Sequence, residues 1–590
     1  MTIASHRLAA LRAELAERTL DGFVVPLTDE HMSEYVGLYA RRLEWLTGFS
    51  GSAGTAVVLA DKAAIFVDGR YTLQVRQQVE GNLYSFHGIP AESIAEWLGA
   101  NAPDGARIGY DPWLTTRTFL SAAANVGVNM EPVPDNPVDA VWPDQPVPSD
   151  APAEIQPLEY SGRESADKRA EVVQALEKWR ADALILTQLD EIAWLFNIRG
   201  KDVPRTPVVR AFAILNADAT ATLFLDPAKS TPELTRYLGP DVTVRPYTDF
   251  AGAIPTLSGK IWLDPATAVS AIPDALDKAG AECITAPSPV LLPKAIKNPA
   301  EIAGARAAHL RDGVAVTRFL QWVDEQAPTG TLDELKAEIR LEAFRRESGM
   351  LQDLSFDSIS SFGPNGAVVH YRATPETNRP FSGGSLYLID SGGQYRDGTT
   401  DITRTIAIGT PTPEMRECFT RVLKGHIALA TIRFPKGTSG GQLDVLARQF
   451  LWAAGMDYAH GTGHGVGSYL SVHEGPQRIA TMRSDEVLQP GMIISNEPGY
   501  YAADAWGIRI ENLILVRKDS LPGDQRPMLA FDTLTLAPID RRLIETAMLT
   551  PAEITWIDAY HAAVRTALTP HLDDLARGRL AAQTAPLGEA

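Results

Sequence analysis

The spacing of apolar residues near the start of the chain predicts a helix followed by short buried strands. Leu8, Leu11 and Leu15 recur at helical spacing, which places them on one face of a helix. Short apolar runs follow at 22–25 and 55–59, and turn residues separate them. We therefore expect an α/β domain at the N-terminus.

The same order of elements returns in the second part of the chain. A predicted helix carries Val172 and Leu176 on one face, and apolar runs follow at 183–186 and 211–215. This parallel predicts an internal repeat of whole domains, in which only the first copy has an extra segment at 29–41.

Proline-rich sequence between residues 132 and 152 separates the two copies of the repeat. A third part of the chain follows the second copy. Residues 298–301 combine a helix cap, a proline in the first turn and a glutamate three residues after the cap. The tail after Leu568 is rich in alanine and arginine, and we expect it to fray. The expected fold is α/β (α+β), with domains at 1–150, 151–290 and 291–590.

Two acidic residues follow apolar runs that are typical of buried strands. Asp390 comes directly after residues 386–389, and Glu497 closely follows another such run. Because an unpaired buried carboxylate is costly, each acid is a candidate ligand.

Two further acids lie on alternating runs. Asp401 begins one run, while Arg509 and Glu511 lie two positions apart on another and are expected to point the same way. Arg509 could be a structural partner of Glu511 or Asp401, or a residue of a binding site.

A glycine-rich stretch at 461–467 contains His464. Glycine at every second position allows the backbone to approach another group closely. A phosphate-binding loop is disfavoured, because neither Gly-Lys-Ser/Thr nor a strand–Gly-x-Gly–helix unit is present.

Together these residues form an oxygen-rich set of four carboxylates and one imidazole. Mn²⁺ suits such a set, and Zn²⁺ or Co²⁺ could also fit. Four carboxylates repel one another unless cations separate them, which favours two ions and a hydrolytic centre. The alternative is a set of unrelated surface acids and a loop histidine with ordinary hydrogen bonds. The five candidates are Asp390, Asp401, His464, Glu497 and Glu511.

Composition narrows the function further. A net charge of −19 and a pI near 5.1 argue against nucleic acid or an anionic membrane as partner. The only cysteines are Cys283 and Cys418, which is typical of a reducing compartment. No signal-peptide core and no apolar run of about 18 residues is present, so we expect a cytoplasmic protein.

The sequence resembles the Xaa-Pro aminopeptidases (aminopeptidase P) over nearly its whole length, and is closest to their long, three-domain cytosolic form. The resemblance implies two creatinase-like α/β domains and a pita-bread catalytic domain. Its substrates would be peptides with proline at position two. The motifs that carry it lie at 389–392, 400–405, 460–465, 496–499 and 509–512, with others at 29–35, 68–71, 190–195 and 363–366.

The family pattern also implies how the ions are held. Asp390 binds one ion, Asp401 and Glu511 bridge both, and His464 and Glu497 hold the other. Glu497 would also move a proton from the bridging water.

Five more residues match family positions around the substrate. Amide hydrolysis needs donors for the oxyanion and an acid for the leaving nitrogen, and imidazoles suit both tasks. By resemblance His370 and His473 act at the scissile bond, His460 shapes the pocket, and Tyr501 and Arg509 lie beside the centre. His460 could equally be an ordinary core histidine.

Three other classes remain open. A prolidase shares the ligand set, although the three-domain length and the segment at 29–35 favour aminopeptidase P. Metal-free pita-bread binding modules and creatinase lack the ligands that are all present here.

Trp452 on a predicted helix is expected to be a core residue, whereas relatives of this length are homodimers with tryptophan at the interface.

Overall fold

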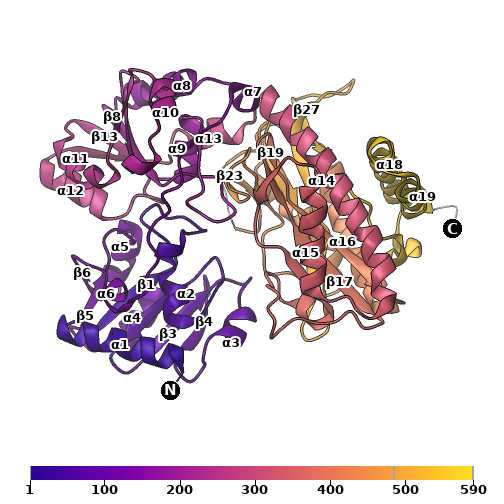
Figure 1. The fold of residues 1–590 in the computed structure, drawn as a ribbon, viewed down its shortest axis with the longest axis horizontal. Coiled ribbons are helices and arrows are strands. Elements are labelled where there is room, and N and C mark those ends of the chain that lie inside the picture. The colour runs from indigo at the N-terminus through magenta and orange to yellow at the C-terminus, as the bar shows by residue number, and fades with distance from the viewer. Residues whose placement is uncertain (1, 483–485, 588–590) are drawn as a thin grey trace. The chain divides into compact units, whose positions relative to one another are not determined.

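The computed structural model describes residues 2–482 and 486–587. The chain divides into two compact units, Met1–Leu291 and Leu292–Ala590, which we call the N-terminal and the C-terminal unit. Both combine sheets with covering helices (Figure 1).

The first lobe of the N-terminal unit is built on a six-stranded sheet in the order β4-β3-β2-β1-β5-β6. β1 pairs antiparallel with β2 and parallel with β5. Leu8, Leu11 and Leu15 of α1 are buried, as their spacing predicted. The elements are α1 (Ile3–Glu17), β1 (Gly22–Pro26), α2 (Arg42–Thr47), β2 (Thr55–Leu59), β3 (Ala63–Val67), α3 (Gln74–Gln78), β4 (Ser85–Gly88), α4 (Ile94–Asn101), β5 (Arg107–Tyr110), α5 (Arg117–Asn125), β6 (Asn129–Pro132) and α6 (Pro137–Val141).

The second lobe repeats this topology. Its six strands follow the order β12-β11-β10-β8-β13-β14, with β8 taking the place that β1 has in the first lobe. The predicted internal repeat is therefore present in the fold. The principal elements are α8 (Ser165–Trp179), β8 (Ala183–Leu186), α9 (Leu189–Leu195), β10 (Ala211–Asn216), β11 (Ala221–Leu225), α10 (Pro232–Leu238), β12 (Val242–Arg245), β13 (Lys260–Leu263), α12 (Ala271–Ala279) and β14 (Glu282–Thr285).

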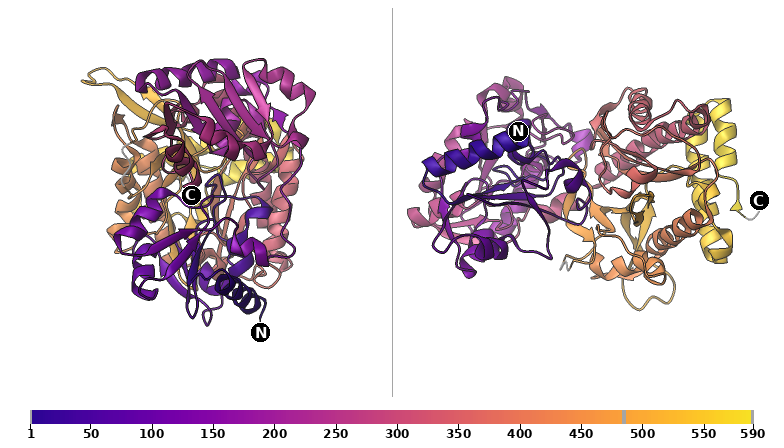
Figure 2. Two further views of the ribbon diagram at one scale, coloured as in Figure 1. Left: turned by 90° about the vertical axis from the view of Figure 1, so that its left-hand side faces the viewer. Right: turned by 90° about the horizontal axis from the view of Figure 1, so that it is seen from below.

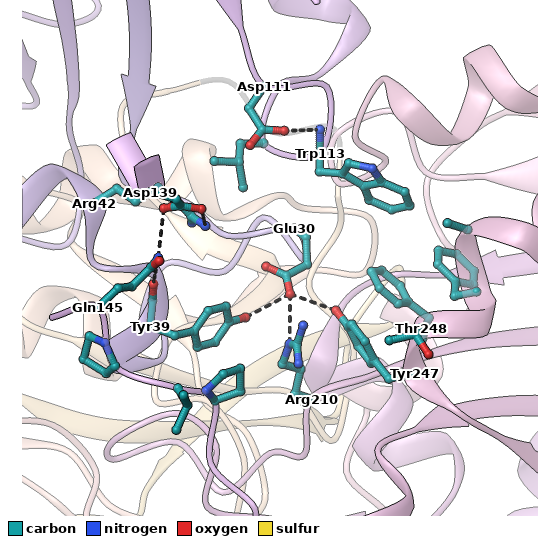
Figure 3. Close-up of a pocket in the computed structure, with 17 residues that line it drawn as sticks. Glu30, Tyr39, Arg42, Asp111, Trp113, Asp139, Gln145, Arg210, Tyr247 and Thr248 are labelled. Atoms are coloured by element: carbon teal, nitrogen blue, oxygen red, sulfur yellow. Dashed lines mark hydrogen bonds and ion pairs between the residues drawn. The ribbon is translucent and has the colours of Figure 1, made fainter. Parts of the chain in front are cut away.

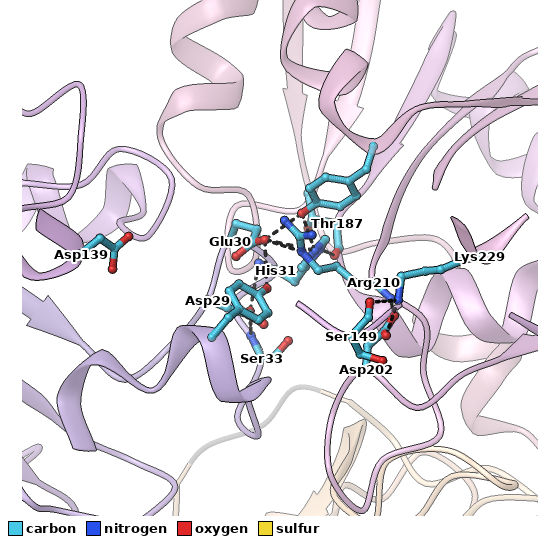
Figure 4. Close-up of polar contacts among 12 residues, drawn as sticks. Asp29, Glu30, His31, Ser33, Asp139, Ser149, Thr187, Asp202, Arg210 and Lys229 are labelled. Carbon is cyan, nitrogen blue, oxygen red and sulfur yellow. Dashed lines mark hydrogen bonds and ion pairs between the residues drawn. The ribbon is translucent and has the colours of Figure 1, made fainter. Parts of the chain in front are cut away.

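The extra segment at 29–41 joins the two lobes. Glu30 Oε1 accepts hydrogen bonds from Tyr39 Oη at 3.0 Å, Tyr247 Oη at 2.8 Å and Arg210 Nε at 2.9 Å, beside a cavity of about 610 Å³ (Figure 3). The buried His31 ring places Nδ1 2.8 Å from the carbonyl oxygen of Thr187 (Figure 4). Burial alone would raise the pKa of Glu30, but His31 and Arg210 outweigh it and lower that pKa to about 2.

The C-terminal unit contains two sheets that matter for the site. One has the order β16-β17-β20, and the other has the order β21-β28-β27-β24-β22-β23. The strands of the whole C-terminal unit, including those of its smaller sheets, are β15 (Leu351–Leu354), β16 (Ile359–Phe362), β17 (Ser385–Ser391), β18 (Gly393–Tyr395), β19 (Gly398–Thr399), β20 (Ile402–Ile408), β21 (Phe434–Pro435), β22 (Gly463–Gly465), β23 (Glu474–Ile479), β24 (Ile493–Asn496), β25 (Gly499–Ala502), β26 (Trp506–Arg509), β27 (Asn512–Asp519) and β28 (Met528–Thr533).

Helices cover these sheets. Asn298 caps α14 (Pro299–Gln326) in a capping box with Glu301, as the sequence predicted. α14 packs against α15 (Glu334–Arg346), and α16 (Pro413–Thr431) packs against α17 (Gly440–Trp452). α18 (Pro551–Leu568) contacts both α14 and α16 at one side of this unit (Figure 2).

Two expectations from the sequence are wrong. The tail after Leu568 does not fray, because α19 (Asp574–Gln583) buries Leu580 and packs against α14; residues 588–590 lie outside the described part. Trp452 is 45% exposed rather than a core residue, because it is the last residue of α17 and lies on the solvent side. None of the helices in the described part of the chain has the length and apolar character of a membrane span.

Candidate metal centre

Asp390 and Asp401 come from two paired strands. Asp390 is the penultimate residue of β17, and Asp401 immediately precedes β20. These strands pair antiparallel with Asp390 opposite Thr403, so both carboxylates lie at the same end of the pair. Both residues are buried, as the apolar sequence before Asp390 predicted.

The other three candidates come from the larger sheet. His464 is the middle residue of β22, Glu497 directly follows β24, and Glu511 directly precedes β27. Because β22, β24 and β27 are neighbours in the sheet, residues distant in sequence meet at one place. Gly463 permits this approach, since a Cβ there would lie 1.9 Å from the carbonyl oxygen of Ser495.

The carboxylates of Asp401, Glu497 and Glu511 lie near the His464 ring. His464 Nε2 lies 3.5 Å from Asp401 Oδ2 and 3.5 Å from Glu497 Oε1. One ligand atom each from Asp401, His464 and Glu511 lies within 4.8 Å of the others. His464 Nδ1 lies 2.9 Å from the carbonyl oxygen of Gly465, which can only accept, so Nδ1 carries the proton and the lone pair of Nε2 is left free to bind a cation between the carboxylates.

The hydrogen bonding and the pKa shifts of these residues are those expected of a metal centre. Within residues 2–482 and 486–587, the buried atoms Asp390 Oδ1, Asp401 Oδ1 and Glu511 Oε1 have no hydrogen-bond partner. Burial and then neighbouring carboxylates raise the pKa of Asp401 and of Glu511 well above the ordinary value. Cations satisfy such oxygens and remove their mutual repulsion, and this donor set suits Mn²⁺, Zn²⁺ or Co²⁺.

Arg509 pairs with an acid that the sequence did not suggest. Its Nη2 donates to Asp390 Oδ2 at 2.7 Å, because β26 packs against β17. The expected partners were Glu511 and Asp401. Arg509 reaches Glu511 only through Thr403, whose Oγ1 accepts from Arg509 Nε at 3.1 Å and donates to Glu511 Oε2 at 2.8 Å.

Arg509 also connects the centre to two predicted substrate residues. Arg509 Nη1 donates to Tyr501 Oη at 2.6 Å, and this hydroxyl lies 2.9 Å from His460 Nε2. His460 Nδ1 lies 2.8 Å from the carbonyl oxygen of Gly461. His460, Tyr501, Arg509 and Asp390 therefore form one continuous chain of hydrogen bonds.

The two remaining histidines lie on different supports. His473 packs edge-on against His464, with ring centroids 4.4 Å apart at 71°. His370 follows the 3-10 helix η6 (Gly363–Ala367), and η6 packs against β26, the strand that ends at Arg509. Their catalytic roles stay predictions.

Two buried residues near the centre were missed by sequence reasoning. Arg404 donates to the carbonyl oxygen of Glu511 at 2.7 Å and to Asn512 Oδ1 at 2.8 Å, which braces the start of β27. His426 on α16 lies with Nδ1 3.1 Å from the carbonyl oxygen of Asn496 and with Nε2 3.1 Å from Asn512 Nδ2. Arg404 belongs to a motif at 400–405, whereas His426 carries no signal in the sequence.

Family models cover most of the chain. Residues 303–518 match metallopeptidase family M24, and residues 527–587 match the C-terminal region of that peptidase family. Residues 7–138 and 144–301 each match the creatinase/prolidase N-terminal domain.

Full-length relatives agree with these matches. The "Probable Xaa-Pro aminopeptidase P" of Aspergillus fumigatus is 41% identical, over 99% of this chain and 93% of its own. The protein of the same name from Aspergillus niger is 40% identical, over 99% of both chains. The chain belongs to metallopeptidase family M24.

Solved structures narrow the placement within this family. An X-prolyl aminopeptidase from Caenorhabditis elegans, a cytosolic enzyme with a di-nuclear active site, is 32% identical with a TM-score of 0.95, over 99% of this chain and 100% of its own. A prolidase from Pyrococcus horikoshii is 23% identical with a TM-score of 0.50 and covers 64% of this chain and 100% of its own, which shows the fold alone. Over its whole length the chain groups with the Xaa-Pro aminopeptidases, which confirms the resemblance and the fold class.

Proposed function

We propose that the protein is a metal-dependent aminopeptidase that hydrolyses the bond between an N-terminal residue and a proline at position two. The observation that carries this proposal is the meeting of Asp401 and Glu511 at His464, with a buried oxygen on each carboxylate that has no hydrogen-bond partner among the described residues. The substrate class rests on the full-length relatives that carry the name Xaa-Pro aminopeptidase P.

Five side chains would hold two divalent ions, and we propose Mn²⁺ as the native metal, with Zn²⁺ and Co²⁺ as alternatives. Bound ions of this kind polarise the scissile carbonyl and lower the pKa of the attacking water. Arg509 would hold the Asp390 carboxylate in a fixed orientation through its hydrogen bond to Oδ2. The proposed ligands are Asp390, Asp401, His464, Glu497 and Glu511.

The remaining residues would handle protons and charge. Glu497 Oε1 accepts from Ser495 Oγ at 3.0 Å, which fixes the carboxylate that is proposed to take a proton from the water. His370 and His473 would stabilise the oxyanion and protonate the leaving nitrogen, which carries no hydrogen in a proline amide. His460 and Tyr501 would shape the pocket together with Arg509.

We further propose a cytoplasmic homodimer with three domains, at 1–150, 151–290 and 291–590. The division keeps each lobe of the N-terminal unit as one domain. Trp452 and Val445 are 45% and 44% exposed and lie seven residues apart on α17, so they form an apolar stripe suited to a second copy. The C. elegans enzyme is described as cytosolic, which supports the location.

The test uses metal-stripped protein reloaded with Mn²⁺, Co²⁺ or Zn²⁺. A free Xaa-Pro-Xaa tripeptide should turn over rapidly, whereas its N-acetylated form, an Xaa-Ala-Xaa control and the dipeptide Xaa-Pro should not. Elemental analysis should find about two ions per chain. Rapid cleavage of the dipeptide alone would indicate a prolidase, and no turnover with any metal would indicate a binding module.

A further inference from the structure

One buried acid outside the metal centre collects an unusual number of donors. Glu334 is the first residue of α15, and its side chain is fully buried. Its Oε1 accepts from the backbone N–H of Phe362 at 2.6 Å, and its Oε2 accepts from the backbone N–H of Arg379 at 2.9 Å and from Tyr371 Oη at 2.9 Å. Asn365 Nδ2 lies 3.0 Å from both oxygens.

All of these donors belong to, or border, one segment, residues 363–379, which we call the His370 loop. Phe362 precedes the loop, Asn365 and Tyr371 lie within it, and Arg379 ends it. One carboxylate therefore ties the beginning, the middle and the end of the loop to α15. The backbone N–H of Glu334 also donates to the carbonyl oxygen of Arg379 at 3.3 Å, which closes the same junction.

The His370 loop also packs on residues that lie beside the metal centre. Val368 and Tyr371 are buried in one cluster with Leu388, two residues before Asp390, and with Tyr501. Backbones meet here as well, since a Cβ on Gly507 would lie 1.7 Å from the carbonyl oxygen of Gly366. His370 lies between two residues that are fixed in this cluster.

We infer that Glu334 is a positioning residue that holds the His370 loop, and through it His370, against the centre. This inference rests on the proposed role of His370. A glycine-containing loop of this length has many conformations of its own, so its order needs an anchor. A carboxylate is suited to this task because it accepts several hydrogen bonds at once, and bonds to a charged acceptor are the stronger ones.

The first test is Glu334→Gln, which keeps the shape but replaces one acceptor oxygen with an NH₂ group that faces donors. Hydrogen exchange of 363–379 should speed up, while exchange of β17 and β24 and metal binding stay unchanged. Turnover of the tripeptide should fall roughly 10- to 100-fold, because a misplaced catalytic group costs up to about that factor. KM should change little. Unchanged exchange in the loop overturns the inference.

A double-mutant cycle separates positioning from a general structural effect. If Glu334 acts through His370, then Glu334→Gln should change kcat less than about twofold in a His370→Ala background. An equal loss of kcat in both backgrounds overturns the inference. If His370→Ala alone keeps wild-type kcat, His370 has no catalytic role, and Glu334 cannot act on turnover through it. The proposed peptidase activity would stand, because the peptide is still cleaved.

Two further variants complete the design. Tyr371→Phe removes one donor to Glu334 Oε2, so it should also speed up exchange in the loop and lower turnover, but by less. This variant tests the inference if Glu334→Gln does not fold. Glu342→Gln is the matched control, since Glu342 lies two turns later on α15 and pairs with Arg346 at the surface. Wild-type exchange in Tyr371→Phe, or a loosened loop in Glu342→Gln, counts against the inference.

Discussion

Glu30→Gln is expected to destabilise the N-terminal unit by about 3 kcal/mol near neutral pH. The carboxylate joins the two lobes through Tyr39, Arg210 and Tyr247, and its side chain is only 13% exposed (Figure 3). Lowering a carboxyl pKa from 4.5 to about 2 corresponds to about 3 kcal/mol of stabilisation when the group is ionised. The amide also leaves Arg210 partly buried without its counter-charge.

The sign of the pH dependence follows from the direction of this shift. Because the pKa of Glu30 is lower in the folded state, its contribution is fully present above pH 4.5 and is lost as the pH falls toward 2. The buried Asp29 has a raised pKa and acts in the opposite direction, but burial, the largest cause of that shift, is the same in both proteins. The difference between wild type and Glu30→Gln should therefore shrink below pH 4.5.

The assay is urea unfolding monitored by hydrogen exchange, which gives the free energy of unfolding of each lobe separately. This matters because a chain with several domains does not unfold in one step. The matched control is Glu92→Gln, since Glu92 accepts from His87 at the surface of the same lobe and should change little. An equal difference at pH 7 and pH 3, or no difference at pH 7, would refute the reasoning.

Three further substitutions have expected outcomes. Glu497→Gln keeps the shape but removes the proton acceptor, so kcat should fall at least ~10²-fold in steady-state kinetics; near-native kcat would exclude Glu497 from the mechanism. In Arg509→Lys the single ammonium group cannot donate to both Asp390 and Tyr501 as the guanidinium does. kcat/KM should therefore fall roughly 10- to 100-fold and metal titration should show weaker binding, whereas wild-type values would refute this role. Trp452→Glu should give monomers in light scattering with native circular dichroism, and a dimer that persists would contradict the proposed interface.

Much of the centre could be predicted from local sequence. Asp390 follows an apolar run, and the cost of a buried acid marks it as a ligand candidate. The glycines around His464 indicate close backbone approach, which Gly463 shows directly. In the N-terminal unit, the repeated order of helix and strands predicted two sheets with the same topology.

Other features depend on contacts between distant strands, which periodicity does not encode. The partner of Arg509 is Asp390 because β26 packs against β17, whereas alternation along one strand suggested only nearby acids. His426 lies on a helix and resembles any core histidine in sequence, yet it braces the strand that precedes Glu497 and the strand that follows Glu511. The packing of α19 against α14 was missed for the same reason.

Glu334 shows how the supports of the metal ligands and of His370 differ. The proposed ligands lie on or beside paired strands, so the ladders of two sheets fix them. His370 lies on a loop, whose order depends on contacts with α15, β17 and β25. In sequence, an acid in the first turn of a helix is explained by the helix dipole alone, and this ordinary explanation conceals the anchor. Substitutions in the loop should therefore alter turnover while metal binding is retained, and substitutions in the strands should alter both.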